Sequence, residues 1–102
     1  MIHPFIEDKL TELGSILKDH RIKKAYLFGS ACTDAFNDTS DIDLLIEPGD
    51  EIDPVLKGEN LWNLYYALKN FLGRDVDIIT RDTLTNKYFI AELDRNSVPI
   101  YG

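Results

Sequence analysis

The residues of this chain that could do chemistry begin with two aspartates, Asp41 and Asp43, which alternate with apolar residues in a strand predicted at about 41–47. On a β-strand, side chains two positions apart leave the same face, with their Cβ atoms about 6–7 Å apart. Two carboxylates at that spacing can share one divalent cation, or hold a pair of cations about 3.5–4 Å apart. The apolar residues between them would then point into a core.

An ordinary half-buried strand with aspartates on its solvent face is the alternative, because the alternation alone predicts it equally well. Aspartate is depleted in strands, and two like charges side by side repel unless a cation or a proton resolves the conflict. An EF-hand calcium loop is excluded, because no glycine follows the acidic run at the required position. The functional hypothesis for this pair is therefore a bound cation.

A glycine–serine pair, Gly29-Ser30, leaves an apolar strand predicted at about 24–28. Ser30 can be the N-cap of a short helix expected at about 30–36, and backbone N–H groups at a helix start attract phosphates. A plain strand-to-helix turn is the alternative for an isolated Gly-Ser pair. The chain contains neither the P-loop pattern nor the Gly-x-Gly-x-x-Gly fingerprint.

A second acidic strand is predicted at about 75–80, with Asp75 and Asp77 on one face and apolar residues on the other. If it lies beside the strand of Asp43, one of these aspartates completes a cluster of three carboxylates. We favour Asp77, because it lies deeper in the strand, whereas Asp75 lies at the start of the strand beside Arg74. An exposed, charged strand end is the alternative for both.

Together, the Gly-Ser pair, the Asp-x-Asp run and the later aspartate resemble the polymerase-beta-like nucleotidyltransferase superfamily. Within this superfamily, residues 24–101 resemble the minimal nucleotidyltransferases. The resemblance implies an α/β fold, with a small mixed central sheet and helices packed over it. It also implies an enzyme that transfers a nucleotide monophosphate, in the favoured case AMP from ATP, to a hydroxyl.

The same resemblance assigns roles to individual residues. Gly29 and Ser30 would bind the triphosphate of the nucleotide. Asp41 and Asp43 would bind two Mg²⁺ ions. Asp77 would be the third catalytic carboxylate, binding one metal ion and helping to deprotonate the acceptor hydroxyl.

The chain departs from the family pattern directly after the serine. Many members have an arginine and then a glycine where this chain has Thr33 and Asp34. The loss of a cation beside the phosphates weakens nucleotide binding, since one charge-assisted contact contributes about 1.5–3 kcal/mol. Lys23, Lys24 and Arg81 are the candidates for a substitute cation, and the sequence does not place them.

Minimal nucleotidyltransferases of this kind resemble the antitoxin half of a two-protein pair, whose other half is a small helical protein of the HEPN type. The resemblance therefore implies transfer of AMP to a HEPN partner. An alternative of another class is a binding module that neutralises the HEPN partner by contact, without chemistry. A metal-free acidic α/β domain is a third possibility, and it requires all three motifs to be coincidental.

Composition bounds the remaining possibilities. The 102 residues support one domain, 1–102. Eleven basic and eighteen acidic residues give a net charge of −7, so we expect no binding of long nucleic acid and favour a basic protein partner. The single cysteine, Cys32, excludes an internal disulfide and is typical of the cytoplasm; we expect a buried, inert thiol. No signal peptide or membrane-spanning segment is expected.

Helices are predicted at 5–19, 60–72 and 83–95, and a short edge strand containing Pro99 is predicted at 98–101. Trp62 and Tyr66 lie off the apolar stripe of the second of these helices. They indicate either a surface that contacts another subunit, as in a homo-oligomer, or packing under a neighbouring loop.

Overall fold

The computed structural model describes residues 3–33, 36–37, 39–49 and 53–102. Its elements, in chain order, are α1 (Pro4–Glu7), α2 (Leu10–Asp19), β1 (Ile22–Phe28), the 3₁₀ turn η1 (Gly29–Cys32), β2 (Ile42–Pro48), α3 (Pro54–Leu72), β3 (Val76–Thr80), the 3₁₀ turn η2 (Arg81–Thr83), α4 (Lys87–Asn96) and β4 (Val98–Tyr101).

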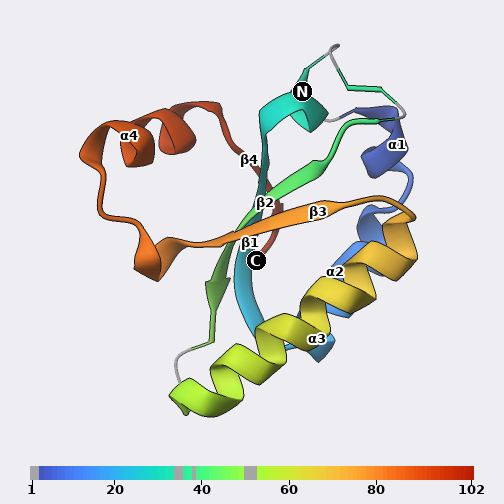
Figure 1. Ribbon diagram of the computed structural model, residues 1–102. Coiled ribbons are helices and arrows are strands. Elements are labelled where there is room, and N and C mark those ends of the chain that lie inside the picture. Colours follow the sequence, from blue (N-terminus) through green and yellow to red (C-terminus); the bar gives the residue numbers. More distant parts are fainter. Residues whose placement is uncertain (1–2, 34–35, 38, 50–52) are drawn as a thin grey trace.

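The four strands form one mixed sheet in the order β3-β2-β1-β4 (Figure 1). β1 runs antiparallel to both β2 and β4, whereas β2 and β3 are parallel. Parallel neighbours need a crossover connection, and α3 supplies it. The expected α/β fold with a mixed sheet is confirmed.

One face of the sheet is covered by α2 and α3, which lie together on the same side of it (Figure 1). The apolar residues of β2 that face these helices, Ile42, Leu44 and Ile46, are fully buried. They pack with Leu64 and Leu68 of α3 in the main hydrophobic core. The alternation that predicted an inward apolar face on this strand is therefore confirmed.

The other face of the sheet is partly covered by α4, which lies on the opposite side from α2 and α3 (Figure 1). Leu45 of β2, which alternates with the core-facing residues, is fully buried, and Leu93 of α4 is 4% exposed. Toward the start of β2 this second face carries Asp43 instead of an apolar residue. Among the described residues, none of the helices combines the length and the apolar character needed to cross a bilayer.

The predicted helix 5–19 is two helices, because the chain leaves helical geometry at Lys9, where φ is −111° and ψ is 3°. Phe5 of the short α1 packs against Phe36, with ring centroids 5.8 Å apart. This contact with a distant loop redirects the first turn, although the apolar spacing runs through the break unchanged.

Two other helices begin away from their predicted starts. α3 begins at Pro54 rather than residue 60, because the Asp53 side chain accepts a hydrogen bond from the Val55 amide and caps the helix. α4 begins at Lys87 rather than residue 83, because the Asn86 side chain accepts hydrogen bonds from two amides of its first turn.

Candidate functional site

The first aspartate of the pair lies at the entrance to β2. The sequence predicted that Asp41 starts this strand. The strand begins instead at Ile42, so Asp41 precedes it by one residue. The Ile42 amide donates a hydrogen bond of 3.0 Å to the Asp75 carbonyl. This bond aligns the starts of β2 and β3, and Asp41 is exposed beside it.

The second aspartate of the pair lies directly beside the third candidate. Asp43 of β2 and Asp77 of β3 are partners in the parallel register, and neighbouring strands are about 4.8 Å apart. Both alternate with apolar residues that turn toward the core, so both side chains leave the opposite face. The structure therefore brings these two carboxylates together, as the sequence predicted.

The charges of the three carboxylates act on one another. Partial burial raises the pKa of Asp43 above its ordinary value, and the negative charges of Asp77 and Asp41 raise this pKa further. Such repulsion favours a bound cation or a proton. The donors are carboxylate oxygens, which suit Mg²⁺. Within the described ranges, no group of three His, Cys, Asp or Glu side chains is close enough together to form a ready-made metal site.

Gly29 packs its backbone against the Asp43 carboxylate. Its φ is +73°, in the left-handed region, and a Cβ there would collide with an Asp43 carboxylate oxygen and lie 3.2 Å from Cγ. Phe28, the residue before it, is the register partner of Asp43. The sheet pairing thus joins the two motifs, and only glycine fits both the backbone angle and the space.

Ser30 does not cap a helix, so this prediction is wrong. η1 is a single 3₁₀ turn whose N-cap is Phe28, without a side-chain cap. The Ser30 carbonyl accepts hydrogen bonds from the Thr33 amide and the Thr33 hydroxyl, each 2.9 Å long. The Ser30 hydroxyl has no hydrogen-bond partner in the described part of the chain, which leaves it able to bind an anion.

Cys32, the last residue of η1, is half-buried. Its thiol donates a hydrogen bond of 3.2 Å to the Leu27 carbonyl, and burial raises its pKa. A raised pKa lowers the fraction of reactive thiolate. These observations support the expected inert thiol.

The substitute cation that the sequence called for is not found at Arg81. Its guanidinium pairs with Asp94 at 2.5 Å and with Glu47 at 3.8 Å. Glu47 lies four residues beyond Asp43 on β2, about 13 Å along the strand. Lys24 is the register partner of Glu47 and so lies at the same distant end of the sheet. Thr33 is exposed and neutral, and Asp34 lies outside the described residues.

Arg74 is a residue of the site region that sequence reasoning did not single out. Its Nη1 donates to the carbonyls of Asn37 at 2.9 Å and Ser40 at 3.0 Å. The guanidinium also lies over the rings of Phe5 and Phe36, 4.3 and 4.5 Å from their centroids. Arg74 therefore fixes the loop that leads into Asp41. The sequence signal that could have indicated Arg74 is its position directly before an acidic strand.

Asp75 is paired instead of being part of the carboxylate group. Its Oδ1 lies 3.4 Å from the Lys69 ammonium, and its side chain is 69% exposed. The choice of Asp77 over Asp75 from the sequence agrees with this arrangement.

Two cavities border the carboxylates. One, of about 540 Å³, is bounded by Asp41 together with Lys69 and Arg74. The other, of about 500 Å³, is bounded by Asp77 and by aromatic residues of α3. Open space therefore adjoins the site on a polar side and on an apolar side.

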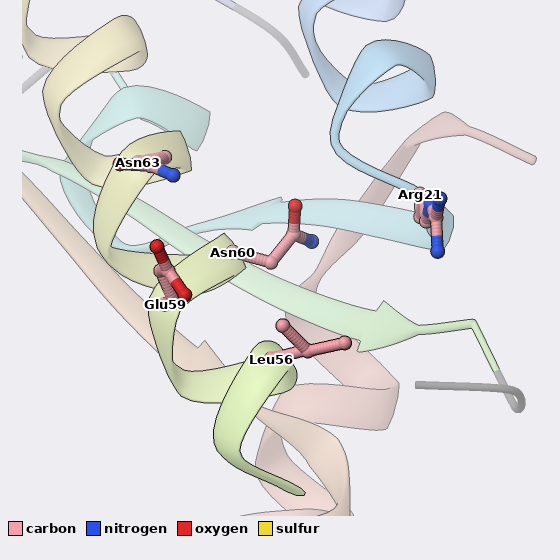
Figure 2. Close-up of a pocket in the computed structure, with 5 residues that line it drawn as sticks. All are labelled: Arg21, Leu56, Glu59, Asn60 and Asn63. Atoms are coloured by element: carbon pink, nitrogen blue, oxygen red, sulfur yellow. The ribbon is translucent and has the colours of Figure 1, made fainter. Parts of the chain in front are cut away.

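A third cavity, of about 300 Å³, contains none of the candidate residues. Figure 2 shows its lining residues from α3, namely Leu56, Glu59, Asn60 and Asn63, with Arg21 across from them. The Asn60 amide donates a hydrogen bond to the His20 carbonyl at the end of α2. This contact supports the turn at Arg21, whose φ is +58°, so Asn60 has a structural role here.

Comparison with known proteins identifies the family. A model of the family "Polymerase beta, Nucleotidyltransferase" matches residues 11–102. Two proteins of Methanocaldococcus jannaschii, each provisionally named a protein adenylyltransferase, are similar to the chain. One is 36% identical over 72 residues, covering 68% of this chain and 70% of the relative. The other is 31% identical over 99 residues, covering 89% and 97%.

Solved structures share the fold. A minimal nucleotidyltransferase matches with a TM-score of 0.77 at 22% identity, over 97% of this chain and 96% of the other. A toxin–antitoxin complex with AMP-PNP contains a chain that matches with a TM-score of 0.71 at 22% identity, over 91% and 73%. A complex of AMPylated HEPN toxin and MNT antitoxin from Shewanella oneidensis contains another, with a TM-score of 0.66 at 20% identity, over 94% and 71%.

The fold of the chain is that of the minimal nucleotidyltransferases. The match to the family model covers nearly the whole sequence, and it includes each of the predicted site residues. This chain belongs to the polymerase beta nucleotidyltransferase family and is a nucleotidyltransferase.

Proposed function

We propose that this chain is a Mg²⁺-dependent adenylyltransferase that transfers AMP from ATP to a hydroxyl of a partner protein. The observation that supports it best is the alignment of Asp43 with Asp77 across β2 and β3, with Gly29 packed against the Asp43 carboxylate. In this proposal the two carboxylates are metal ligands, and the turn beside them binds the phosphates. The names of the curated relatives support AMP as the group transferred.

The turn and the carboxylates have separate tasks in this proposal. Gly29 lets the backbone approach the triphosphate closely, and the Ser30 hydroxyl donates a hydrogen bond to it. Asp41, Asp43 and Asp77 would hold Mg²⁺. The bound ion would neutralise the charge that develops on the phosphates and would make the acceptor hydroxyl easier to deprotonate.

The reaction is an in-line displacement at the α-phosphorus of ATP. The acceptor oxygen forms a bond to this phosphorus, and the bond from the phosphorus to the oxygen bridging to the β-phosphate breaks, so pyrophosphate leaves. Asp77 accepts the proton of the acceptor hydroxyl. Its exposure on the outermost strand of the sheet suits a residue that must meet a hydroxyl on another protein.

The acceptor in this proposal belongs to a small helical protein of the HEPN type. The toxin–antitoxin complexes among the structural neighbours support this choice of partner. The net charge of −7 supports a partner with a basic surface. The single Cys32, which cannot form an internal disulfide, supports a reducing, cytoplasmic location.

Intact-mass measurement tests the proposal. The purified chain is incubated with ATP, Mg²⁺ and a HEPN-type protein, taken from the neighbouring gene where that gene encodes one. We expect the partner to gain the mass of one or more AMP groups, and EDTA to abolish the gain. Calorimetry with ATP, GTP, CTP and UTP, each with and without Mg²⁺, identifies the preferred nucleotide. A partner whose mass never changes would contradict the proposal.

Neutralisation of the HEPN partner by contact alone is the second candidate function. The observation that favours it is the neutral Thr33 at the position of the family arginine, together with the pairing of Arg81 elsewhere. A stable complex that neutralises the partner with no mass change, in the presence of ATP and Mg²⁺, would favour this function over transfer.

A further inference from the structure

The outer edge of β3 is open. β3 is at one end of the sheet, and none of the described residues forms a strand on its far side. The Asp75 carbonyl accepts from Ile42 of β2, so the backbone groups of alternate residues, Asp77 among them, face β2. Those of Val76, Ile78 and Thr80 therefore face outward. Val76 and Ile78 each offer a donor and an acceptor to a further strand, whereas the Thr80 carbonyl already accepts a hydrogen bond of 2.8 Å from the Thr83 hydroxyl.

The opposite edge of the sheet differs. It is formed by β4, which contains Pro99, and proline lacks the amide hydrogen that a neighbouring strand needs. β3 contains no proline. Of the two edges, only that of β3 offers an uninterrupted backbone to another chain.

An aromatic wall runs along the open edge. The cavity of about 500 Å³ lies between the outward-facing residues of β3 and the outer flank of α3, which contributes Trp62, Tyr65 and Tyr66. The Trp62 and Tyr66 side chains pack edge to face, with centroids 5.3 Å apart, yet Trp62 remains 63% exposed and Tyr66 47%. The alternative that a neighbouring loop covers them is therefore wrong for the described structure, and the wall is open to another molecule.

The groove is negatively charged. Asp77 lines it, and Asp75, whose side chain is 69% exposed, lies just before the same strand in contact with Lys69. Two cations that flank β3 in the sequence are already paired, Lys69 with Asp75 and Arg81 with Asp94. With a net charge of −7 on the whole chain, the complementary ligand is cationic.

We propose that the acceptor protein docks by adding an extended, cationic segment to the open edge of β3, with apolar side chains against Trp62 and Tyr66. The docked segment runs past Asp77. A hydroxyl on this segment, or next to it, therefore lies close to the carboxylate that accepts its proton. This inference rests on the proposed transfer function and adds how the acceptor is recognised. A second copy of this chain fits the edge poorly, because its own Asp75 and Asp77 would face those of the first.

Binding of synthetic peptides tests the docking mode without the chemistry. The probe is a fluorescein-labelled Lys-Val-Tyr-Val-Lys peptide, and its anisotropy is measured with the full chain in EDTA, without ATP. One matched peptide carries N-methyl groups on alternate amides, and another has Glu in place of Lys. We expect each change to weaken binding about tenfold or more, because one removes the strand hydrogen bonds and the other the charge match.

The protein variants are Trp62→Ala and Tyr88→Ala, with circular dichroism to verify folding. Trp62→Ala removes the tryptophan ring of the aromatic wall, which is 63% exposed, and is expected to weaken binding of the probe about tenfold. Tyr88, which is 88% exposed on α4 and lies outside the groove, serves as the control, and its variant is expected to bind within about twofold of the parent.

Several outcomes overturn the inference. They are absence of binding at millimolar peptide, equal binding of the N-methylated or acidic peptide, and equal binding by Trp62→Ala. Competition between Mg-ATP and the peptide would show that a nucleobase occupies the groove. A dimer in sedimentation that Trp62→Ala dissociates would make a second copy the occupant. Because the peptide titration itself is made without ATP and metal, a failure of AMP transfer leaves its result intact.

Discussion

The two faces of β2 differ in what they are built to do. Ile42, Leu44 and Ile46 point into the core and are fully buried. Asp43, which lies between the first two, points the other way toward Asp77 and raises the local negative charge. Burial of the apolar face stabilises the folded protein, whereas the acidic face brings like charges close together.

This difference shows that stability and chemistry are assigned to alternating residues of the same short strand. The core face fixes the position of the backbone, and the backbone in turn fixes the carboxylates. Substitutions on the two faces should therefore have separable effects, on folding for one face and on transfer for the other.

The largest effect is expected from Leu44→Ala on the core face. Removing a fully buried leucine side chain leaves a cavity and should lower the free energy of unfolding by about 2–5 kcal/mol. Urea denaturation followed by circular dichroism measures the change. Val55→Ala is the control, since Val55 is 77% exposed and should change the free energy by less than about 0.5 kcal/mol. Equal effects would show that the core is not centred on β2.

Asp43→Asn should impair the chemistry of the acidic face and leave the packing of the core face unchanged. The amide keeps the size of the side chain and removes its charge, so AMP transfer should fall about 10²–10³-fold while the folded structure persists. Mass spectrometry of the partner measures transfer, and circular dichroism verifies folding. Full activity in this variant would remove Asp43 from the site.

Gly29→Ala tests the close contact between the Gly29 backbone and the Asp43 carboxylate, and Gly73→Ala is its matched control. Both glycines have positive φ, +73° and +67°, so each alanine should cost about 1–2 kcal/mol of folding free energy. Only the Cβ at position 29 collides with the Asp43 carboxylate, because nothing lies within 4 Å of a Cβ at position 73. We expect transfer to be lost in Gly29→Ala and kept in Gly73→Ala; loss in both would assign the effect to backbone strain.

The smallest effect is a pH dependence of stability. The pKa of Asp43 is higher in the folded state than its ordinary value of 3.8, so the ionised carboxylate disfavours folding. Asp43→Asn should therefore raise the melting temperature at pH 7 in EDTA, by less than about 4 °C, because the group is largely solvated. The gain should shrink as the pH falls toward 3.8, where the wild-type carboxylate becomes protonated. A gain that is independent of pH would exclude the charge as its cause.

The parts of the structure that the sequence predicted well are those with a strict local period. β2 and β3 were located within one residue, because apolar and acidic residues alternate along them. The break at Lys9 was missed, since it depends on the distant contact of Phe5 with Phe36. The start of α3 was missed although Asp53-Pro54 is a regular capping signal.

The sequence predicted the meeting of two carboxylates, but the expected cluster of three is not preformed among the described residues. Asp43 and Asp77 were expected to meet, and the parallel register brings them together. The close approach of Gly29 to Asp43 depends on the register of β1 with β2, which a single sequence does not specify. The role of Arg74 depends on carbonyl groups of a loop 34 and 37 residues away, and no local pattern marks such partners.

Trp62 is the only tryptophan of the chain, and it is mostly in water while the protein is folded. Its emission in the native state should resemble that of an unfolded chain, so fluorescence will follow denaturation poorly. Any molecule that covers it should shift the emission to shorter wavelength. The protein therefore carries an intrinsic optical probe of what lies beside β3, one that responds to occupancy and is nearly silent to unfolding.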